Sequence, residues 1–159
     1  MTEKEFEQRV TALTQEMYST ASGLLRCYQD RQDAVQECVW RAWRGLPKLR
    51  DETFFKAWLM RILINECRTI GRRLGRETVS DCIREESVPD AHEERLRDEE
   101  LHQAVMCLPE KLRLTVILFY IDGFSLREIS HTLRIPEGTV KSRLTQARKK
   151  LKDTLAREV

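Results

Sequence analysis

The chain has 159 residues, of which 41% are hydrophobic and 34% charged, and its formal net charge at pH 7 is +2. This length and apolar content allow one packed domain or two small ones. No apolar run approaches the roughly 20 residues that span a bilayer, and no signal-like segment precedes the acidic start, so we expect a cytoplasmic protein without membrane insertion.

Charge is unevenly distributed along the chain. Lys and Arg outnumber Asp and Glu by 13 to 10 in residues 1–73 and by 11 to 7 in residues 100–159, whereas acids lead by 9 to 4 in residues 74–99. The acidic segment is poor in large apolar residues and contains Gly75 and Pro89, which is typical of a linker. We therefore expect two small all-α domains, 1–73 and 100–159, joined by a flexible linker.

Apolar residues recur at helical spacing throughout the first domain. Three stretches carry this pattern: residues 6–24, 34–46 and 54–73. Gly45 and Pro47 loosen or end the second stretch, and residues 48–53 form a short polar loop. The pattern predicts three helices.

The third of these helices has a second, polar ridge. Its members follow one another at spacings of three or four: Trp58, Arg61, Asn65, Arg68 and Arg72. A planar ring with cations around it can stack a base and hold the neighbouring phosphates, as proteins that bind single strands do. On this ridge alone, an ordinary core role for Trp58 with solvated arginines stays open.

The second domain opens with a helical pattern over residues 90–108 and later carries two helices joined by a tight turn. Ser125 can accept a backbone N–H bond as an N-cap, and Glu128 completes a capping box, so one helix begins near Ser125. Pro136 cannot continue that helix because it lacks an N–H, but it suits the first turn of a new one. The sequence therefore predicts a helix-turn-helix unit.

The second helix of that unit has one apolar and one cationic face. The apolar stripe consists of Val140, Leu144, Ala147 and Leu151. The polar side carries Lys141, Ser142, Thr145, Gln146, Arg148, Lys149 and Lys152. Six Lys or Arg and no acid lie between residues 141 and 152. This is the arrangement of a DNA recognition helix, although a basic face that is merely solvated is common on helices taken alone.

No pattern of catalytic or metal-binding residues accompanies these helices. The sequence has no Gly-rich phosphate loop, no metal-ligand cluster and no nucleophile with a base at a telling spacing, so we expect neither an enzyme nor a bound metal or cofactor. The five cysteines form no CxxC pair, which predicts neither a disulfide framework nor a zinc site. Four cysteines stand in apolar company and are expected to be small buried side chains: Cys27, Cys38, Cys67 and Cys107.

Four stretches of the chain resemble signatures of the ECF (extracytoplasmic function) sigma factors, the smallest members of the sigma-70 family. Residues 30–43 read DRQDAVQECVWRAW, similar to DAEDLVQEVFLRAW of region two, and residues 54–65 read FFKAWLMRILIN, similar to SSFRTWLYRIARN. Residues 108–113 and 123–144 resemble LPERLR and GLSYAEIA…GTVKSRL of region four. The matches follow the family's order and spacing.

The resemblance implies binding surfaces on the first domain. The face that docks on core RNA polymerase in the family corresponds to Asp33, Gln36, Glu37 and Arg41. Residues 46–53 correspond to the specificity loop, which accepts a base flipped from the non-template strand of the minus-ten promoter element, and flipping requires unstacking that base. The melted single strand would be held by Lys48, Arg50, Trp58, Arg61, Asn65 and Arg68.

The resemblance also implies a duplex-reading surface on the second domain. The residues that match the family's minus-thirty-five interface are Lys141, Ser142, Thr145 and Gln146, with Arg143, Arg148 and Lys149 as phosphate or structural contacts. Relatives often carry His-Arg or Phe-Arg where this chain has Thr145 and Gln146. Because Gln can bond adenine bidentately and Thr can touch a thymine methyl, the pair predicts an A/T-leaning contact.

The interpretation that accounts for all of these features is a sigma factor that binds core RNA polymerase and promoter DNA and directs transcription initiation. In this family regulation usually comes from an anti-sigma factor, so we expect such a partner. Two alternatives stay open: a free-standing helix-turn-helix regulator that binds duplex operators as a dimer, and an interaction protein whose basic faces bind an acidic partner protein.

Overall fold

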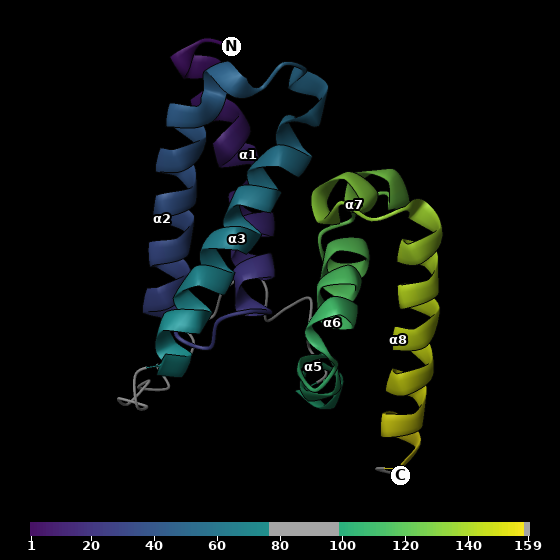
Figure 1. The fold of residues 1–159 in the computed structure, drawn as a ribbon. Helices are drawn as coiled ribbons and strands as arrows, with labels where there is room; N and C mark the ends of the chain where they lie inside the picture. Colours follow the sequence, from purple (N-terminus) through teal and green to yellow (C-terminus); the bar gives the residue numbers. More distant parts are fainter. Residues whose placement is uncertain (77–98, 158–159) are drawn as a thin grey trace. The chain divides into compact units, whose positions relative to one another are not determined.

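A computed structural model of the chain describes residues 1–76 and 99–157, which fall into two units. Every regular element in these two ranges is a helix (Figure 1). The prediction of an all-α chain with two helical domains is therefore confirmed. None of the described helices is long and apolar enough to cross a membrane. Nearly all of the predicted linker lies outside the described residues.

The first unit is built from three long helices that lie alongside one another (Figure 1). The elements are α1 (Glu3–Ser22), α2 (Tyr28–Gly45), the short 3-10 turns η1 (Leu46–Lys48) and η2 (Glu52–Phe54), and α3 (Phe55–Arg76). Helix α3 packs most extensively on α2, and α1 contacts both. Met17 of α1 and Leu59, Met60 and Leu63 of α3 are fully buried between them. The three predicted helices are confirmed.

Local signals explain where these helices begin and end. Thr2 and Glu5 form a capping box at the start of α1: the Thr2 hydroxyl oxygen accepts the Glu5 N–H at 3.2 Å, and the Glu5 carboxylate accepts the Thr2 N–H at 2.8 Å. Helix α2 ends at Gly45, and Pro47 lies in η1, as expected of two helix-breaking residues. A Cβ at Gly45 would lie 3.4 Å from Cζ2 of Trp58, so this glycine also permits a close approach between the end of α2 and α3.

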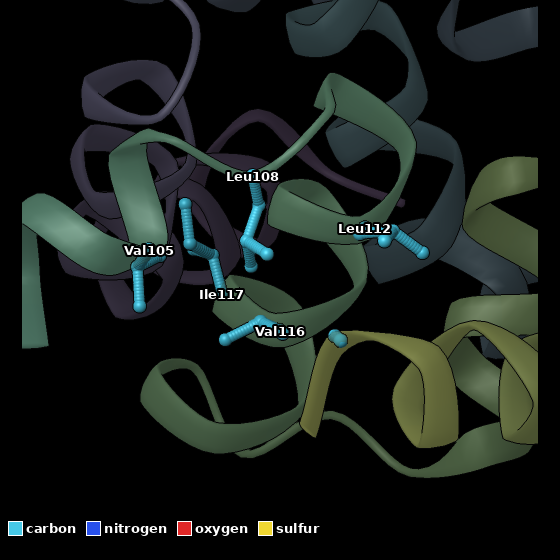
Figure 2. Close-up of a cluster of buried hydrophobic side chains, with 6 residues drawn as sticks. Val105, Leu108, Leu112, Val116 and Ile117 are labelled. Atoms are coloured by element: carbon cyan, nitrogen blue, oxygen red, sulfur yellow. The ribbon is translucent and has the colours of Figure 1, made fainter. Parts of the chain in front are cut away.

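The core of the second unit surrounds a helix over residues 110–116, which the apolar pattern did not predict, and five elements make up the described part of the unit. Its elements are α5 (Glu99–Met106), α6 (Glu110–Val116), the π-helical turn η3 (Ile117–Ile121), α7 (Leu126–Leu133) and α8 (Glu137–Arg157). Figure 2 shows the buried cluster, formed by Val105, Leu108, Leu112, Val116, Ile117 and Ala147. Helix α6 packs mainly on α8, so it supports that helix from the core of the unit. Helix α5 covers the described end of the pattern predicted over residues 90–108, and residues 90–98 lie outside the described residues.

The helix-turn-helix begins and turns as the sequence predicts. The Ser125 hydroxyl oxygen accepts the Glu128 N–H at 3.1 Å and the Glu128 carboxylate accepts the Ser125 N–H at 3.1 Å, which confirms the capping box of α7. After α7, Arg134 adopts the left-handed region with φ 56°, an uncommon conformation for a residue other than glycine. The Ser130 hydroxyl donates to the Ile135 carbonyl at 2.5 Å across this turn, and α8 follows Pro136.

The cysteines divide into two groups. Cys38 and Cys67 are buried as predicted, and burial raises the pKa of the Cys38 thiol and raises that of Cys67 to about 12. The prediction was wrong for Cys107, which follows the end of α5 and is exposed. It was also wrong for Cys27, which is half-buried. Cys82 lies outside the described residues.

Candidate nucleic-acid and protein-binding surfaces

Helix α8 separates its apolar and polar residues cleanly. Val140, Leu144 and Ala147 are buried against the rest of the second unit, and Leu151 is half-buried at its edge. The side chains exposed to solvent are Lys141, Ser142, Thr145, Gln146, Arg148 and Lys149, and Arg143 is half-buried. The structure therefore brings the predicted duplex-reading residues together on one helix, with a surface rich in cations and open to a partner.

The Thr145 hydroxyl donates a hydrogen bond within α8. Its Oγ1 donates to the Lys141 carbonyl oxygen at 3.0 Å, a bond within the helix. The hydroxyl oxygen can still accept a hydrogen bond, and the methyl group is the part of this side chain that would contact a thymine methyl. The A/T-leaning contact of Thr145 and Gln146 stays a prediction.

Arg148 is engaged with a residue that the sequence analysis missed. Its Nε donates to the hydroxyl of Tyr120 in η3 at 2.5 Å. Tyr120 is an exposed aromatic beside a basic helix, and it is 28 positions away from Arg148 in sequence. No helical periodicity connects residues this far apart on different elements, so the pairing was not predictable from spacing.

The predicted docking face lies on α2. Asp33 and Gln36 are exposed and Glu37 is half-buried. Arg41 instead reaches toward α3: its Nε lies 3.0 Å from the Glu37 carboxylate and 2.8 Å from Oε1 of Glu66, whose side chain is only 11% exposed. Arg41 therefore pairs with a nearly buried carboxylate between two helices, while its own side chain is 57% exposed, so the docking contact expected of it stays a prediction.

A large aromatic residue extends the same face of α2. Trp40 is 52% exposed, and the guanidinium carbon of Arg44 lies 4.6 Å from its ring centre. Positions 33, 37, 40 and 44 recur at spacings of four, three and four, and position 36 lies three after 33 and four before 40, so all of them lie on one side of the helix. Sequence reasoning missed Trp40 and Arg44, although this spacing was a signal that could have found them.

The polar ridge of α3 is only partly exposed to solvent. Asn65, Arg68 and Arg72 are exposed and Arg61 is half-buried. Trp58 is half-buried: its ring centre lies 5.9 Å from that of Phe55, and its edge adjoins Gly45. Part of the Trp58 ring therefore packs against the protein, and the rest is accessible for stacking.

The loop between α2 and α3 is tied to the start of the first unit. Lys48 and Arg50 are exposed there. Arg9 of α1 donates from Nη1 to the Glu52 carbonyl oxygen at 3.2 Å and pairs through Nη2 with the Glu52 carboxylate at 3.3 Å. Hydrogen bonds from Thr53 hold the pKa of the neighbouring Asp51 carboxyl below its usual value. The loop therefore exposes the cations of Lys48 and Arg50, and the contact between Arg9 and Glu52 holds its backbone against α1.

Comparison with known proteins places both units in one family. Residues 10–77 match the family model for sigma-70 region 2, and residues 98–151 match that for sigma-70, region 4. The chain is 32% identical over 142 residues to the RNA polymerase sigma-H factor of Pseudomonas aeruginosa, covering 80% of this chain and 74% of that protein. It is 34% identical over 134 residues to the ECF RNA polymerase sigma-E factor of Escherichia coli K12, covering 75% and 70%.

Solved structures give the same result. The sigma factor RpoE, solved in complex with the anti-sigma factor NepR from Bartonella quintana, matches with a TM-score of 0.75 and 25% identity over 96% of this chain and 98% of that one. CnrH, solved in complex with the cytosolic domain of CnrY, matches in fold with a TM-score of 0.74 and 24% identity over 99% and 92%. The class that the fold and its surfaces define is thus the helical, two-domain transcription initiation factor. This chain belongs to the ECF sigma factors of the sigma-70 family, and it is an alternative sigma factor that acts with RNA polymerase in transcription initiation.

Proposed function

We propose a division of labour in which each unit of this sigma factor binds one part of the promoter while the first unit is mounted on core RNA polymerase. Docking uses the exposed face of α2, with Asp33, Gln36 and Glu37 as polar contacts and Trp40 as the apolar one. The domains are taken as 1–73 and 100–159, with residues 74–99 as the tether between them. The protein acts in the cytoplasm and catalyses no reaction of its own.

The minus-ten element is bound in single-stranded form by the first unit. The residues proposed for this surface are Lys48, Arg50, Trp58, Arg61, Asn65 and Arg68. Two observations support the surface: the exposed cations on the loop and on α3, and the half-buried Trp58 ring between them. A stacking ring and adjacent cations are what a splayed strand needs, because its bases lose their neighbours when the duplex opens.

The minus-thirty-five element is read by α8. The single observation that carries this proposal is the division of α8 into a buried apolar stripe and an exposed basic face that has no acidic residue between Lys141 and Lys152. Lys141, Ser142, Thr145 and Gln146 read base edges near the start of the helix, while Arg143, Arg148 and Lys149 serve the phosphates or the packing of the helix.

An anti-sigma factor is the proposed regulatory partner. Of the structural relatives described above, RpoE was solved with the anti-sigma factor NepR bound, and CnrH with the cytosolic domain of CnrY bound. The exposed aromatic and charged face of α2 supports the proposal, because an inhibitor that covers this face prevents docking on the polymerase.

In-vitro transcription tests this assignment. The purified chain is expected to bind promoter DNA poorly by itself and to direct specific initiation once core RNA polymerase is added. A specific footprint by the chain alone would favour a dimeric operator-binding regulator. Weak, sequence-independent DNA binding even with polymerase present would favour a protein that binds an acidic partner.

A further inference from the structure

An exposed aromatic side chain stands next to the basic face of α8. Tyr120 is 53% exposed, and its hydroxyl oxygen accepts the Nε–H of Arg148 at 2.5 Å. The guanidinium carbon lies 5.6 Å from the Tyr120 ring centre, so the cation lies toward the hydroxyl end of the ring rather than in close stacking on its face. Phe119 packs edge-on against the same ring, with centres 4.9 Å apart, and thereby limits its rotation.

The two side chains retain hydrogen-bond donors. Arginine carries five N–H donors, and the bond to Tyr120 uses only the one on Nε. A tyrosine hydroxyl that accepts one bond can still donate its own proton. Among the ion pairs of the described residues, none joins Arg148 to a carboxylate. A cation and an O–H held side by side form a donor set that suits the oxygens of a phosphate.

The position of Arg148 on α8 indicates which part of a nucleic acid it meets. At 100° per residue, Arg148 lies on the same side as Lys141 and Thr145, roughly 70° from the centre of the buried stripe. It therefore lies at the edge of the exposed face, next to the body of the unit. The centre of a recognition helix faces the bases, and its edges face the walls of the groove, which are the phosphate backbones.

We propose that Tyr120 and Arg148 form a preorganised phosphate-binding site that extends the duplex interface from α8 onto η3. This inference rests on the proposed function, because it requires α8 to lie on duplex DNA. The Tyr120 hydroxyl holds the guanidinium before DNA arrives, so less side-chain freedom is lost on binding. Tyr120 acts partly through Arg148 and partly by its own O–H.

The test measures binding of holoenzyme, assembled from core polymerase and the full chain, to a promoter fragment that the wild-type holoenzyme transcribes. Affinity is followed over a range of salt concentrations. For Arg148→Ala, we expect the slope of log affinity against log salt to fall by about 0.9 and the affinity itself to fall about tenfold. Tyr120→Phe keeps the ring and removes the hydroxyl, and it should weaken binding about threefold in the wild-type background and by clearly less beside Arg148→Ala, where only the contact of its own O–H is lost. Lys111→Ala, which removes an exposed cation from α6, is the matched control and should leave the slope unchanged.

Several results would overturn the site. An unchanged salt slope in Arg148→Ala would exclude a phosphate contact. Equal weakening by Tyr120→Phe in both backgrounds, with a lowered melting temperature, would assign Tyr120 a purely structural role. A fall in slope for Lys111→Ala as large as that for Arg148→Ala would mean that the slope reports net charge. If wild-type holoenzyme fails to prefer the promoter fragment over a scrambled one, the proposed function itself is wrong, a failure that is distinct from all of these.

Discussion

The substitution Arg41→Ala distinguishes a structural role of this residue from a role in docking on the polymerase. Arg41 projects from α2, and its Nε lies 2.8 Å from Oε1 of Glu66 on α3. The Glu66 side chain is 11% exposed, whereas that of Arg41 is 57% exposed. Replacing Arg41 by alanine leaves a nearly buried carboxylate without its counter-charge, so we expect the first unit to lose stability.

The structure also sets the size of this loss. Breaking a fully buried ion pair by removing one partner costs about 3–5 kcal/mol, but solvent around Arg41 weakens this pair. A charge-assisted hydrogen bond is worth about 1.5–3 kcal/mol, so we expect the free energy of unfolding to fall by about 2 kcal/mol. The lost pair with Glu37, four residues away on the same helix, contributes only about 0.3–0.5 kcal/mol of this.

Thermal unfolding followed by circular dichroism measures the effect. For a unit of this size, a loss of about 2 kcal/mol lowers the melting temperature by about 8–16 °C. Glu66→Gln is the matched control because it keeps the shape and removes the charge. In that background, Arg41→Ala should cost less than about 1 kcal/mol. Binding to core polymerase, measured below the melting transition, should change little.

The opposite pattern would refute the reasoning. A melting temperature that stays within about 1 °C of the wild-type value, a shift that corresponds to only a few tenths of a kcal/mol, would mean that solvent already satisfies Glu66. If Arg41→Ala abolished polymerase binding without lowering the melting temperature, Arg41 would be assigned to the docking surface.

Four further predictions follow from single residues. Ser125→Ala removes the cap of α7 and should lower the free energy of unfolding of the second unit by about 1 kcal/mol in denaturant titrations. Trp58→Ala should reduce promoter opening, detected by reactivity of unpaired thymines, while polymerase binding persists; loss of both would identify Trp58 as a packing residue. Lys141→Ala should weaken binding to the upstream element and lower its salt slope by about 0.9, and an unchanged slope would remove Lys141 from the interface. Trp40→Ala should weaken core polymerase binding at unchanged melting temperature, because this ring is exposed.

Much of the fold was predictable because its signals are local. The capping box at Ser125, the break at Gly45 and Pro47, and the apolar stripe of α8 each involve residues within a few positions of one another. Helix α6 escaped prediction because seven residues give too few turns for a periodic pattern to stand out.

The candidate site was predictable in its members and less so in their roles. Exposure of Lys141 and Gln146 follows from the helical period, and the structure agrees. Trp58 lies on the boundary between core and surface, and periodicity alone could not predict which part of its ring packs against the protein and which part stays accessible for stacking. Cys107 was misjudged because its apolar neighbours belong to the core, whereas its own position follows the end of α5.

By itself, the sequence determined the helical class of this sigma factor, the two-part order of its family signatures and the face of α8 that is exposed to solvent, because hydrophobic period, caps and turns act over a few residues. Only the tertiary structure decided which charged groups are already engaged: Arg41 with Glu66, Arg9 with Glu52 and Arg148 with Tyr120. Each pair joins different elements that meet through packing. Their geometry therefore depends on how the helices assemble, and no local pattern in the chain encodes it.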